Sequence, residues 1–265
     1  MLSRLGSADR SAAWPLTAPS PTVEHNSAEG RTWSRLALRR RAENGAGTQP
    51  LLKITRRRNN VLMHLRCYVT TYDDAMTIMS LVHTKGGVAK TTSAVYLATA
   101  AERRGMDVVL VDADPQGSAL EWAAAVEPAL PFPVVPATRP LEVRRDRELT
   151  IIDTPPGTAQ VIQEAIDVAD MVIVPTGTSP LDVRRVWPTL EITAHRPTAV
   201  LLTGVDLRTR LAEEVRTLFE AEGVPVIGTP ILRREGIRRA YGSIPENLHG
   251  YDDVLIELVE AMSRV

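Results

Sequence analysis

Short apolar segments alternate with amphipathic segments from residue 76 onward, and this rhythm restricts the fold more than any other feature of the sequence. The apolar segments are rich in Val and Ile throughout their length, which is typical of parallel strands covered on both faces. Such strand–helix alternation predicts a doubly wound α/β domain with a mostly parallel sheet. Strands are expected over residues 77–83, 106–114, 149–157, 171–177, 198–206 and 225–231. Helices are expected over residues 91–105, 116–126, 158–170, 179–195, 210–223 and 251–262.

The first 75 residues differ from this domain in composition and charge. Residues 1–50 are rich in Ser, Ala, Arg, Pro and Gly without a sustained period, so we expect a mostly disordered arm over residues 1–75. The arm carries a net charge of +6, and residues 76–265 carry −7, which gives the total of −1. A basic arm either contacts nucleic acid or is a solvated tail. A third alternative is that translation begins at Met76 or Met79.

The cysteine content excludes several classes of protein. Cys67 is the single cysteine of the chain, so there is no internal disulfide and no thiolate cluster for zinc or an iron–sulfur centre. This pattern favours a cytoplasmic protein. No apolar run reaches the roughly 18–20 residues of a membrane span. The five histidines are too scattered in the sequence to propose a metal site.

The segment TKGGVAKTT, residues 84–92, joins the first predicted strand to the first predicted helix. Ligands of such folds bind beyond the carboxyl ends of the strands, where loop amides and a helix N-terminus form an anion site. The usual phosphate-loop pattern, G-x-x-x-x-G-K-[ST], fails here at both glycine positions, where Thr84 and Ala89 stand. The segment still offers what a phosphate site needs: permissive backbone at Gly86 and Gly87, the ammonium of Lys90 and the hydroxyl of Thr91.

The pattern K-G-G-x-x-K-T-T resembles the deviant Walker A loop of the ParA/MinD ATPase superfamily. The resemblance implies that Lys90 neutralises phosphate in its own subunit, whereas Lys85, the signature lysine, reaches the partner's phosphates across a nucleotide-sandwich dimer. Family members commonly have Gly where Ala89 stands. Ala is tolerated there if the residue has a negative φ near the helix start. The implied nucleotide contacts are Lys85, Gly86, Gly87, Val88, Ala89, Lys90, Thr91 and Thr92.

Two acidic motifs strengthen the resemblance. DADPQG, residues 112–117, resembles the family's second carboxylate motif, and LTIIDTPPG, residues 149–157, resembles a Walker B strand. Each alone is a common turn, but together with the loop they are specific. The implied roles are as follows: Asp114 orients or deprotonates the attacking water, Asp112 supports the metal shell, Thr91 and Asp153 hold Mg²⁺, and residues 155–157 form a switch near the γ-phosphate.

Segments further along the chain resemble the smaller ParA proteins that lack an N-terminal DNA-reading domain, so the likeness spans residues 76–265. It implies a P-loop NTPase fold, ATP and Mg²⁺ as cofactors, an ATP-dependent homodimer, and adenine near Pro230 and Leu232. The implied function is plasmid or chromosome partition by a nucleoid-associated protein that binds DNA non-specifically and has a ParB-like partner. Arginines grouped in the C-terminal half are the DNA-binding candidates: Arg184, Arg185, Arg208, Arg210, Arg233, Arg234, Arg238 and Arg239.

Other functions on the same fold remain as alternatives. A MinD-like membrane switch needs a basic amphipathic C-terminal helix, but residues 251–262 are acidic, so we expect them to cover the core and expect no membrane partner. A nitrogenase iron-protein relative needs cluster cysteines, which the predicted domain lacks. An ATP-dependent metabolic ligase stays open, and so does the positioning of another cargo, such as a carboxysome-like body or a chemoreceptor array. Four large side chains are expected in the core, namely Trp122, Trp187, Leu190 and Phe219.

Overall fold

The computed structural model describes residues 76–157 and 159–263, and the predictions for residues 1–75 lie outside the described residues. The strands are β1 (Thr77–Leu81), β2 (Val108–Asp112), β3 (Val134–Pro136), β4 (Leu149–Asp153), β5 (Met171–Thr176) and β6 (Thr198–Leu202). The helices are α2 (Lys90–Arg103), α3 (Ser118–Ala125), α4 (Ala159–Val168), α5 (Pro180–Thr193), α6 (Leu211–Ala221), α7 (Glu235–Arg239) and α8 (Tyr251–Ser263).

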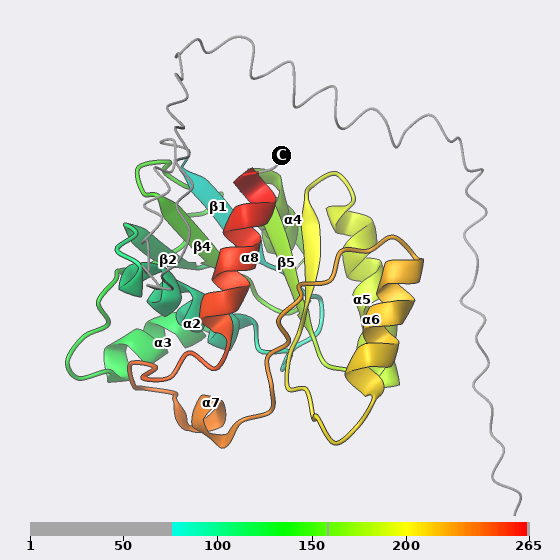
Figure 1. Ribbon diagram of the computed structural model, residues 1–265. Helices are drawn as coiled ribbons and strands as arrows, with labels where there is room; N and C mark the ends of the chain where they lie inside the picture. The colour runs from blue at the N-terminus through cyan, green and yellow to red at the C-terminus, as the bar shows by residue number, and fades with distance from the viewer. Residues whose placement is uncertain (1–75, 158, 264–265) are drawn as a thin grey trace, which may run out of the picture. The chain divides into compact units, whose positions relative to one another are not determined.

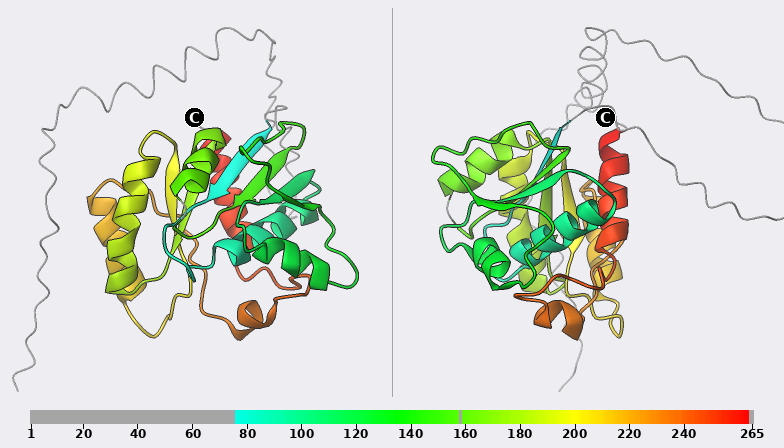
Figure 2. Two further views of the ribbon diagram at one scale, coloured as in Figure 1. Left: turned by 180° about the vertical axis from the view of Figure 1, so that it is seen from behind. Right: turned by 90° about the vertical axis from the view of Figure 1, so that its left-hand side faces the viewer.

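The strands form one six-stranded sheet in the order β3-β2-β4-β1-β5-β6, and every pair in it is parallel. Figure 1 shows α2 and α8 in front of this sheet, and Figure 2 shows α4 behind it, so both faces are covered. The chain leaves β1 toward β2 on one side, while β5 pairs with β1 on the other side. The carboxyl end of β1 is therefore a topological switch point, where doubly wound folds bind their ligands. The predicted fold class is confirmed.

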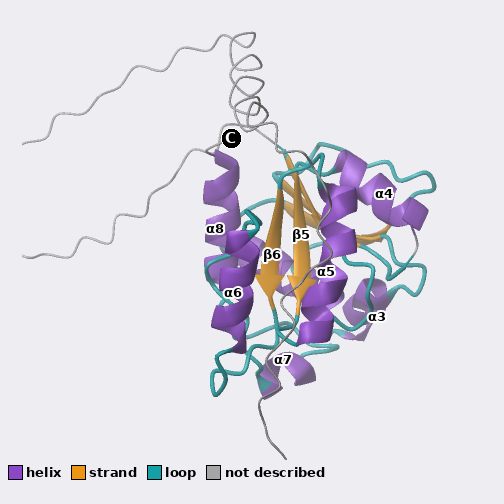
Figure 3. Ribbon diagram, turned by 90° about the vertical axis from the view of Figure 1, so that its right-hand side faces the viewer, coloured by secondary structure: helices purple, strands orange, loops and turns teal. Residues whose placement is uncertain are grey.

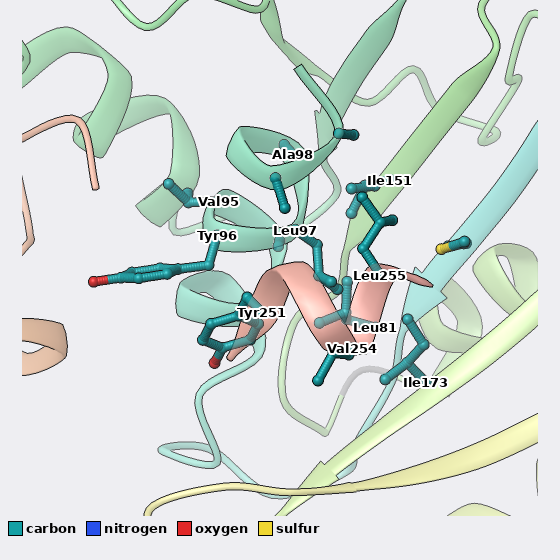
Figure 4. Packing of buried hydrophobic residues seen from close by; sticks show 14 of the residues in the cluster. Leu81, Val95, Tyr96, Leu97, Ala98, Ile151, Ile173, Tyr251, Val254 and Leu255 are labelled. Atoms are coloured by element: carbon teal, nitrogen blue, oxygen red, sulfur yellow. The ribbon is translucent and has the colours of Figure 1, made fainter. Parts of the chain in front are cut away.

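Side chains that alternate along the strands build a separate core on each face of the sheet. In β1, Met79 and Leu81 join the cluster formed with α2 and α8, whereas Ile78 packs toward α4 on the opposite face. Figure 4 shows the first cluster, in which the rings of Tyr96 and Tyr251 lie 4.9 Å apart. The acidic C-terminal helix thus covers the core through its apolar side, as predicted.

The large side chains expected in the core are there. Trp122 and Phe219 are buried, and Trp187 and Leu190 are partly buried against the cluster that α5 and α6 share. The rings of Trp187 and Phe219 are 5.5 Å apart, which joins α5 to α6. None of the described helices is both long enough and apolar enough to cross a membrane.

The strand predicted over residues 225–231 is wrong. The segment follows β6 and forms isolated parallel bridges at Val226 and Leu232, but no continuous strand. The reason lies in the middle of the segment, where the backbone N–H groups of Gly228 and Thr229 donate to the carboxylate of Glu257 in α8, at 2.6 and 2.9 Å. These donors are consequently lost to the ladder. The sixth strand of the sheet is instead β3, a short edge strand that the sequence analysis did not predict.

Candidate functional site

A cleft of about 420 Å³ opens at the carboxyl ends of the central strands. It brings together the loop after β1, the acidic loop after β2 and the loop after β4, as the motifs predicted. Its lining consists of Gly86, Gly87, Ala89, Lys90, Thr91, Thr92, Asp114, Ser118, Thr154 and Pro156. Val88 is absent from this lining because its side chain is buried, and its carbonyl accepts a hydrogen bond from the Thr203 hydroxyl at 3.3 Å.

Backbone N–H groups in the first loop are left available to a ligand. The Lys85 N–H donates to His83 Nδ1 at 2.9 Å, and the Ser93 N–H donates to the Ala89 carbonyl at 2.8 Å. Between them, the N–H groups of residues 86–92 have no acceptor among the described residues. A row of unpaired amides that ends in a helix N-terminus is a favourable site for phosphate.

Ala89 adopts a left-handed backbone conformation, with φ 69° and ψ 31°. The negative φ that would let Ala stand here without strain is therefore not found. Glycine adopts this conformation without penalty, whereas the Ala89 Cβ costs roughly 1–2 kcal/mol there. Nearby in the same loop, Gly86 faces Pro156 at a distance where an added Cβ would make an ordinary van der Waals contact with the ring, at 3.7 Å.

The two lysines of the loop occupy different environments. Lys90 is buried, and its Nζ donates to the Lys85 carbonyl at 3.1 Å. Burial lowers the pKa of Lys90, while the charges of Asp153 and Asp114 oppose this shift. The Lys85 ammonium does not line the cleft but is paired with the carboxylate of Asp182 in α5. Partial burial acts to raise the pKa of Asp182, but hydrogen bonds from Lys85 and Ser179 lower it overall.

Asp112 organises the acidic loop after β2. Its carboxylate accepts from the backbone N–H groups of Asp114, Ala119 and Leu120, at 3.1, 2.9 and 3.0 Å. Asp112 thereby caps α3 and fixes the position of Asp114. One oxygen of Asp114 accepts from the Gln116 N–H at 2.9 Å, and the residue lines the cleft.

Asp153 is the buried acid of the site. Burial raises its pKa to about 7, although the nearby Thr91 hydroxyl and the charge of Lys90 act to lower it. Neither carboxylate oxygen has a hydrogen-bond partner of good geometry among the described residues. An unpartnered buried carboxylate next to a hydroxyl fits a hard cation. The described residues contain no group of three His, Cys, Asp or Glu side chains that could hold a metal. Mg²⁺ generally binds proteins through one or two carboxylates together with waters and substrate phosphates.

The eight candidate DNA-binding arginines are all exposed. Some of them are neighbours: Arg208 is paired with Asp206 at 2.6 Å, and the charge of Arg233 also acts on Asp206. Arg239 pairs with Glu235 on α7, a short helix that lies beyond the carboxyl ends of β5 and β6 in Figure 3. Arg184 and Arg185 lie on α5.

The segment predicted to contact adenine is anchored to β6 rather than placed in the cleft. The Ile231 N–H donates to the Leu202 carbonyl at 2.8 Å, and the Val205 N–H donates to the Ile231 carbonyl at 3.0 Å. Pro230 and Leu232 do not line the described cleft, and their role remains a prediction.

Sequence reasoning missed His83, Ser118, Thr154 and Asp182. A signal existed for Asp182, because Ser179 precedes it by three residues, as in the start of a capped helix. Thr154 follows the predicted Walker B acid directly, and its hydroxyl donates to the Leu81 carbonyl at 2.7 Å. No sequence signal distinguished His83 from the other histidines.

A parallel sheet, a Gly-rich loop between β1 and a helix, and a buried acid on the neighbouring strand together define a nucleotide-binding domain of the P-loop class. Residues 79–244 match the CobQ/CobB/MinD/ParA nucleotide binding domain, and the chain belongs to this family.

Named relatives are similar over much of their length. "Maintenance of carboxysome distribution protein A" of Gloeobacter kilaueensis is 38% identical over 162 residues, which is 56% of this chain and 73% of the relative. "Chromosome-partitioning ATPase Soj" of Thermus thermophilus is 30% identical over 207 residues, which is 61% of this chain and 83% of the relative.

Solved structures share the fold. The cell division ATPase MinD of Pyrococcus furiosus matches with a TM-score of 0.58 at 19% identity, covering 71% of this chain and 100% of that chain. Cobyrinic acid a,c-diamide synthase of Mycobacterium smegmatis, solved with ADP and magnesium, matches with a TM-score of 0.55 at 23% identity. The match covers 71% of this chain and 95% of that chain.

Proposed function

We propose that this protein is a Mg²⁺-dependent ATPase that dimerises around ATP and uses the cycle of dimerisation and hydrolysis to position a cargo. The observation that carries the proposal is the division between the two loop lysines. Lys90 is buried beside the cleft of its own subunit, whereas the Lys85 ammonium is held outside that cleft by Asp182. A lysine placed in this way is better suited to contact the phosphates of a nucleotide bound to a second subunit than those of a nucleotide in the cleft of its own subunit.

The cleft residues suit phosphoryl transfer to water. The N–H groups of residues 86–92 and the Lys90 ammonium would bind the phosphates, and Thr91 and Asp153 would hold the metal ion. When bound, Mg²⁺ would supply positive charge that neutralises the charge developing on the phosphates. Asp114 orients a water and accepts its proton as the water oxygen bonds to the γ-phosphorus and the bond to ADP breaks. Asp112 holds Asp114 through the Asp114 N–H and holds the start of α3 through the N–H groups of Ala119 and Leu120.

Dimerisation is tested with the Asp114→Ala variant, in which we expect ATP to bind without hydrolysis. Light scattering with saturating Mg·ATP should show a stable dimer, and Mg·ADP should give less of it. A variant that stays monomeric under these conditions overturns the proposal. The matched variant Lys85→Ala should still bind a fluorescent ATP analogue but should release no phosphate.

We propose that the dimer positions its cargo along DNA, to which the exposed arginines bind without sequence preference. The cargo is a plasmid or chromosome recognised through a ParB-like partner, and the protein then associates with the nucleoid in the cytoplasm. The similarity to a carboxysome distribution protein supports a second candidate, in which the cargo is a protein body. Both candidate functions use the ATP-dependent dimer and its non-specific binding to DNA, and they differ in the partner protein.

Measurement of ATPase rates with and without plain duplex DNA separates these functions from a metabolic ligase. We expect DNA to raise the rate, and we expect DNA binding to require ATP and to weaken steeply with salt. Turnover that depends on a small-molecule acceptor and ignores DNA would overturn the positioning function.

A further inference from the structure

We infer that His83 is a positioning residue for the two loop lysines: its imidazole fixes the Lys85 peptide unit and thereby sets where the phosphate-binding amides begin. This inference rests on the proposed function, because it assigns a role within the same site. His83 follows β1 directly and is 0% exposed.

The peptide groups of Lys85 are held on both sides. Its N–H donates to His83 Nδ1 at 2.9 Å, and its carbonyl accepts from Lys90 Nζ at 3.1 Å. The His83 ring, the Lys85 peptide and the Lys90 ammonium are therefore connected in series. The N–H and the carbonyl belong to the two peptide groups on either side of the Lys85 Cα, so a displacement of Lys85 would strain both contacts and redirect the side chain that reaches Asp182.

Packing alone does not account for a histidine at this position. The other ring nitrogen, Nε2, is buried and has no hydrogen-bond partner among the described residues. Burying such a group is unfavourable, and an apolar side chain of similar size would avoid that penalty. The bond from Nδ1 to Lys85 is the contact that an apolar side chain could not replace.

This bond also marks a boundary in the loop. The Lys85 N–H is turned inward to His83, whereas the N–H groups of residues 86–92 have no acceptor among the described residues. Without the imidazole, the Lys85 N–H would compete for the same anion and the loop would lose its fixed starting point. His83 thus acts on the reaction through Lys85 and Lys90 and does not itself touch the nucleotide.

Three variants separate positioning from packing. His83→Asn places an amide oxygen near the site of Nδ1, His83→Gln moves that oxygen outward, and His83→Leu fills the volume without an acceptor. Amide hydrogen exchange at Lys85, followed by NMR in the nucleotide-free protein, reports the bond directly. ATPase kinetics and binding of a fluorescent ATP analogue report its effect on function.

We expect His83→Leu to lose exchange protection at Lys85 and to reduce kcat by roughly tenfold to a hundredfold, the scale of an ångström-sized misplacement. Analogue affinity should change much less than kcat, because the amides of residues 86–92 remain. His83→Asn should recover both protection and kcat, and His83→Gln should not.

A folded His83→Leu protein with wild-type kcat and a protected Lys85 amide overturns the inference. Where His83→Leu does not fold, equal behaviour of the Asn and Gln variants overturns it instead. Failure of the proposed function is a different result, because a wild-type protein without ATPase activity would still show whether Lys85 is protected by His83.

Discussion

The nucleotide cleft and the eight exposed candidate arginines of this domain hold their charges in opposite environments. In the cleft, Lys90 is 7% exposed, and both carboxylate oxygens of Asp153 lack a partner among the described residues. The eight candidate arginines, in contrast, are all exposed, and Arg208 and Arg239 already pair with nearby acids. When a buried charge is removed, water cannot take over its interactions. Exposed charges are screened by solvent and salt, so the loss of one of them changes little. Single substitutions should therefore have large effects in the cleft and small ones on the surface.

The comparison predicts its largest effect at Lys90. Lys90→Ala should weaken binding of a fluorescent ATP analogue by roughly a hundredfold or more, about 3 kcal/mol, because it removes a charged hydrogen-bond donor from a dehydrated site. Arg234→Ala is the matched control, since it removes one positive charge from the exposed surface and should leave nucleotide affinity unchanged. Equal losses of nucleotide affinity in the two variants would contradict the difference drawn here between cleft charges and exposed charges.

A pH titration sharpens the description of the cleft. Burial, followed by the charges of Lys90 and Lys85, lowers the pKa of His83 from 6.5 to about 4. The unfolded chain then binds more protons than the folded one between these values, so the free energy of unfolding falls as the pH drops from about 6.5 through 4. The full loss from this group is roughly 3 kcal/mol.

Denaturant unfolding of wild type and His83→Asn over this pH range measures that loss. Asn does not titrate, so the difference between the two curves isolates the imidazole from the carboxylates that also titrate there. Parallel curves would show that His83 is not a dehydrated neutral base.

At the exposed arginines, DNA binding should respond to paired substitutions. Arg233→Gln combined with Arg234→Gln should weaken ATP-dependent DNA binding by roughly tenfold and reduce the salt slope by about 2, because each neutralised phosphate contributes about 0.9 to that slope. The matched pair Arg104→Gln and Arg144→Gln removes the same charge elsewhere on the surface. DNA titrations at several salt concentrations distinguish the pairs, and identical slopes would remove this patch from the DNA interface.

The smallest effect concerns the backbone of the cleft. Ala89→Gly should raise the free energy of unfolding by about 0.5–1 kcal/mol, because glycine adopts a positive φ without the Cβ penalty but has more freedom in the unfolded chain. Ala124→Gly, at an exposed position in α3, should lower it by about 1 kcal/mol. Thermal melting measures both, and a destabilised Ala89→Gly variant would show that the left-handed turn is not strained.

The periodic elements could be predicted from the sequence because their pattern is local. The parallel strands are apolar throughout and the helices carry one apolar side, so the fold class and the position of the phosphate loop follow directly. The failures involve interactions between distant residues. Glu257 interrupts the strand predicted over residues 225–231 from 28 or 29 positions away, and no local pattern shows this.

The candidate site was predictable to a similar extent. The motifs correctly placed Lys90, Thr91 and Asp114 at one cleft. They did not indicate that Asp182 holds Lys85, because an acid 97 positions away is identified by topology and not by spacing. The backbone angle of Ala89 could not be predicted from the residue type, because alanine favours a negative φ and yet adopts φ 69° in this loop.

The ion pair between Lys85 and Asp182 has a consequence for the choice of nucleotide. An ammonium that already has a carboxylate partner moves to a new anion only when that anion attracts it more strongly. Under the proposed function, a triphosphate on the opposite subunit meets this requirement better than a diphosphate, which carries less negative charge. Asp182 thus competes with the phosphates for the Lys85 ammonium. This competition would favour closure of the dimer around ATP over closure around ADP.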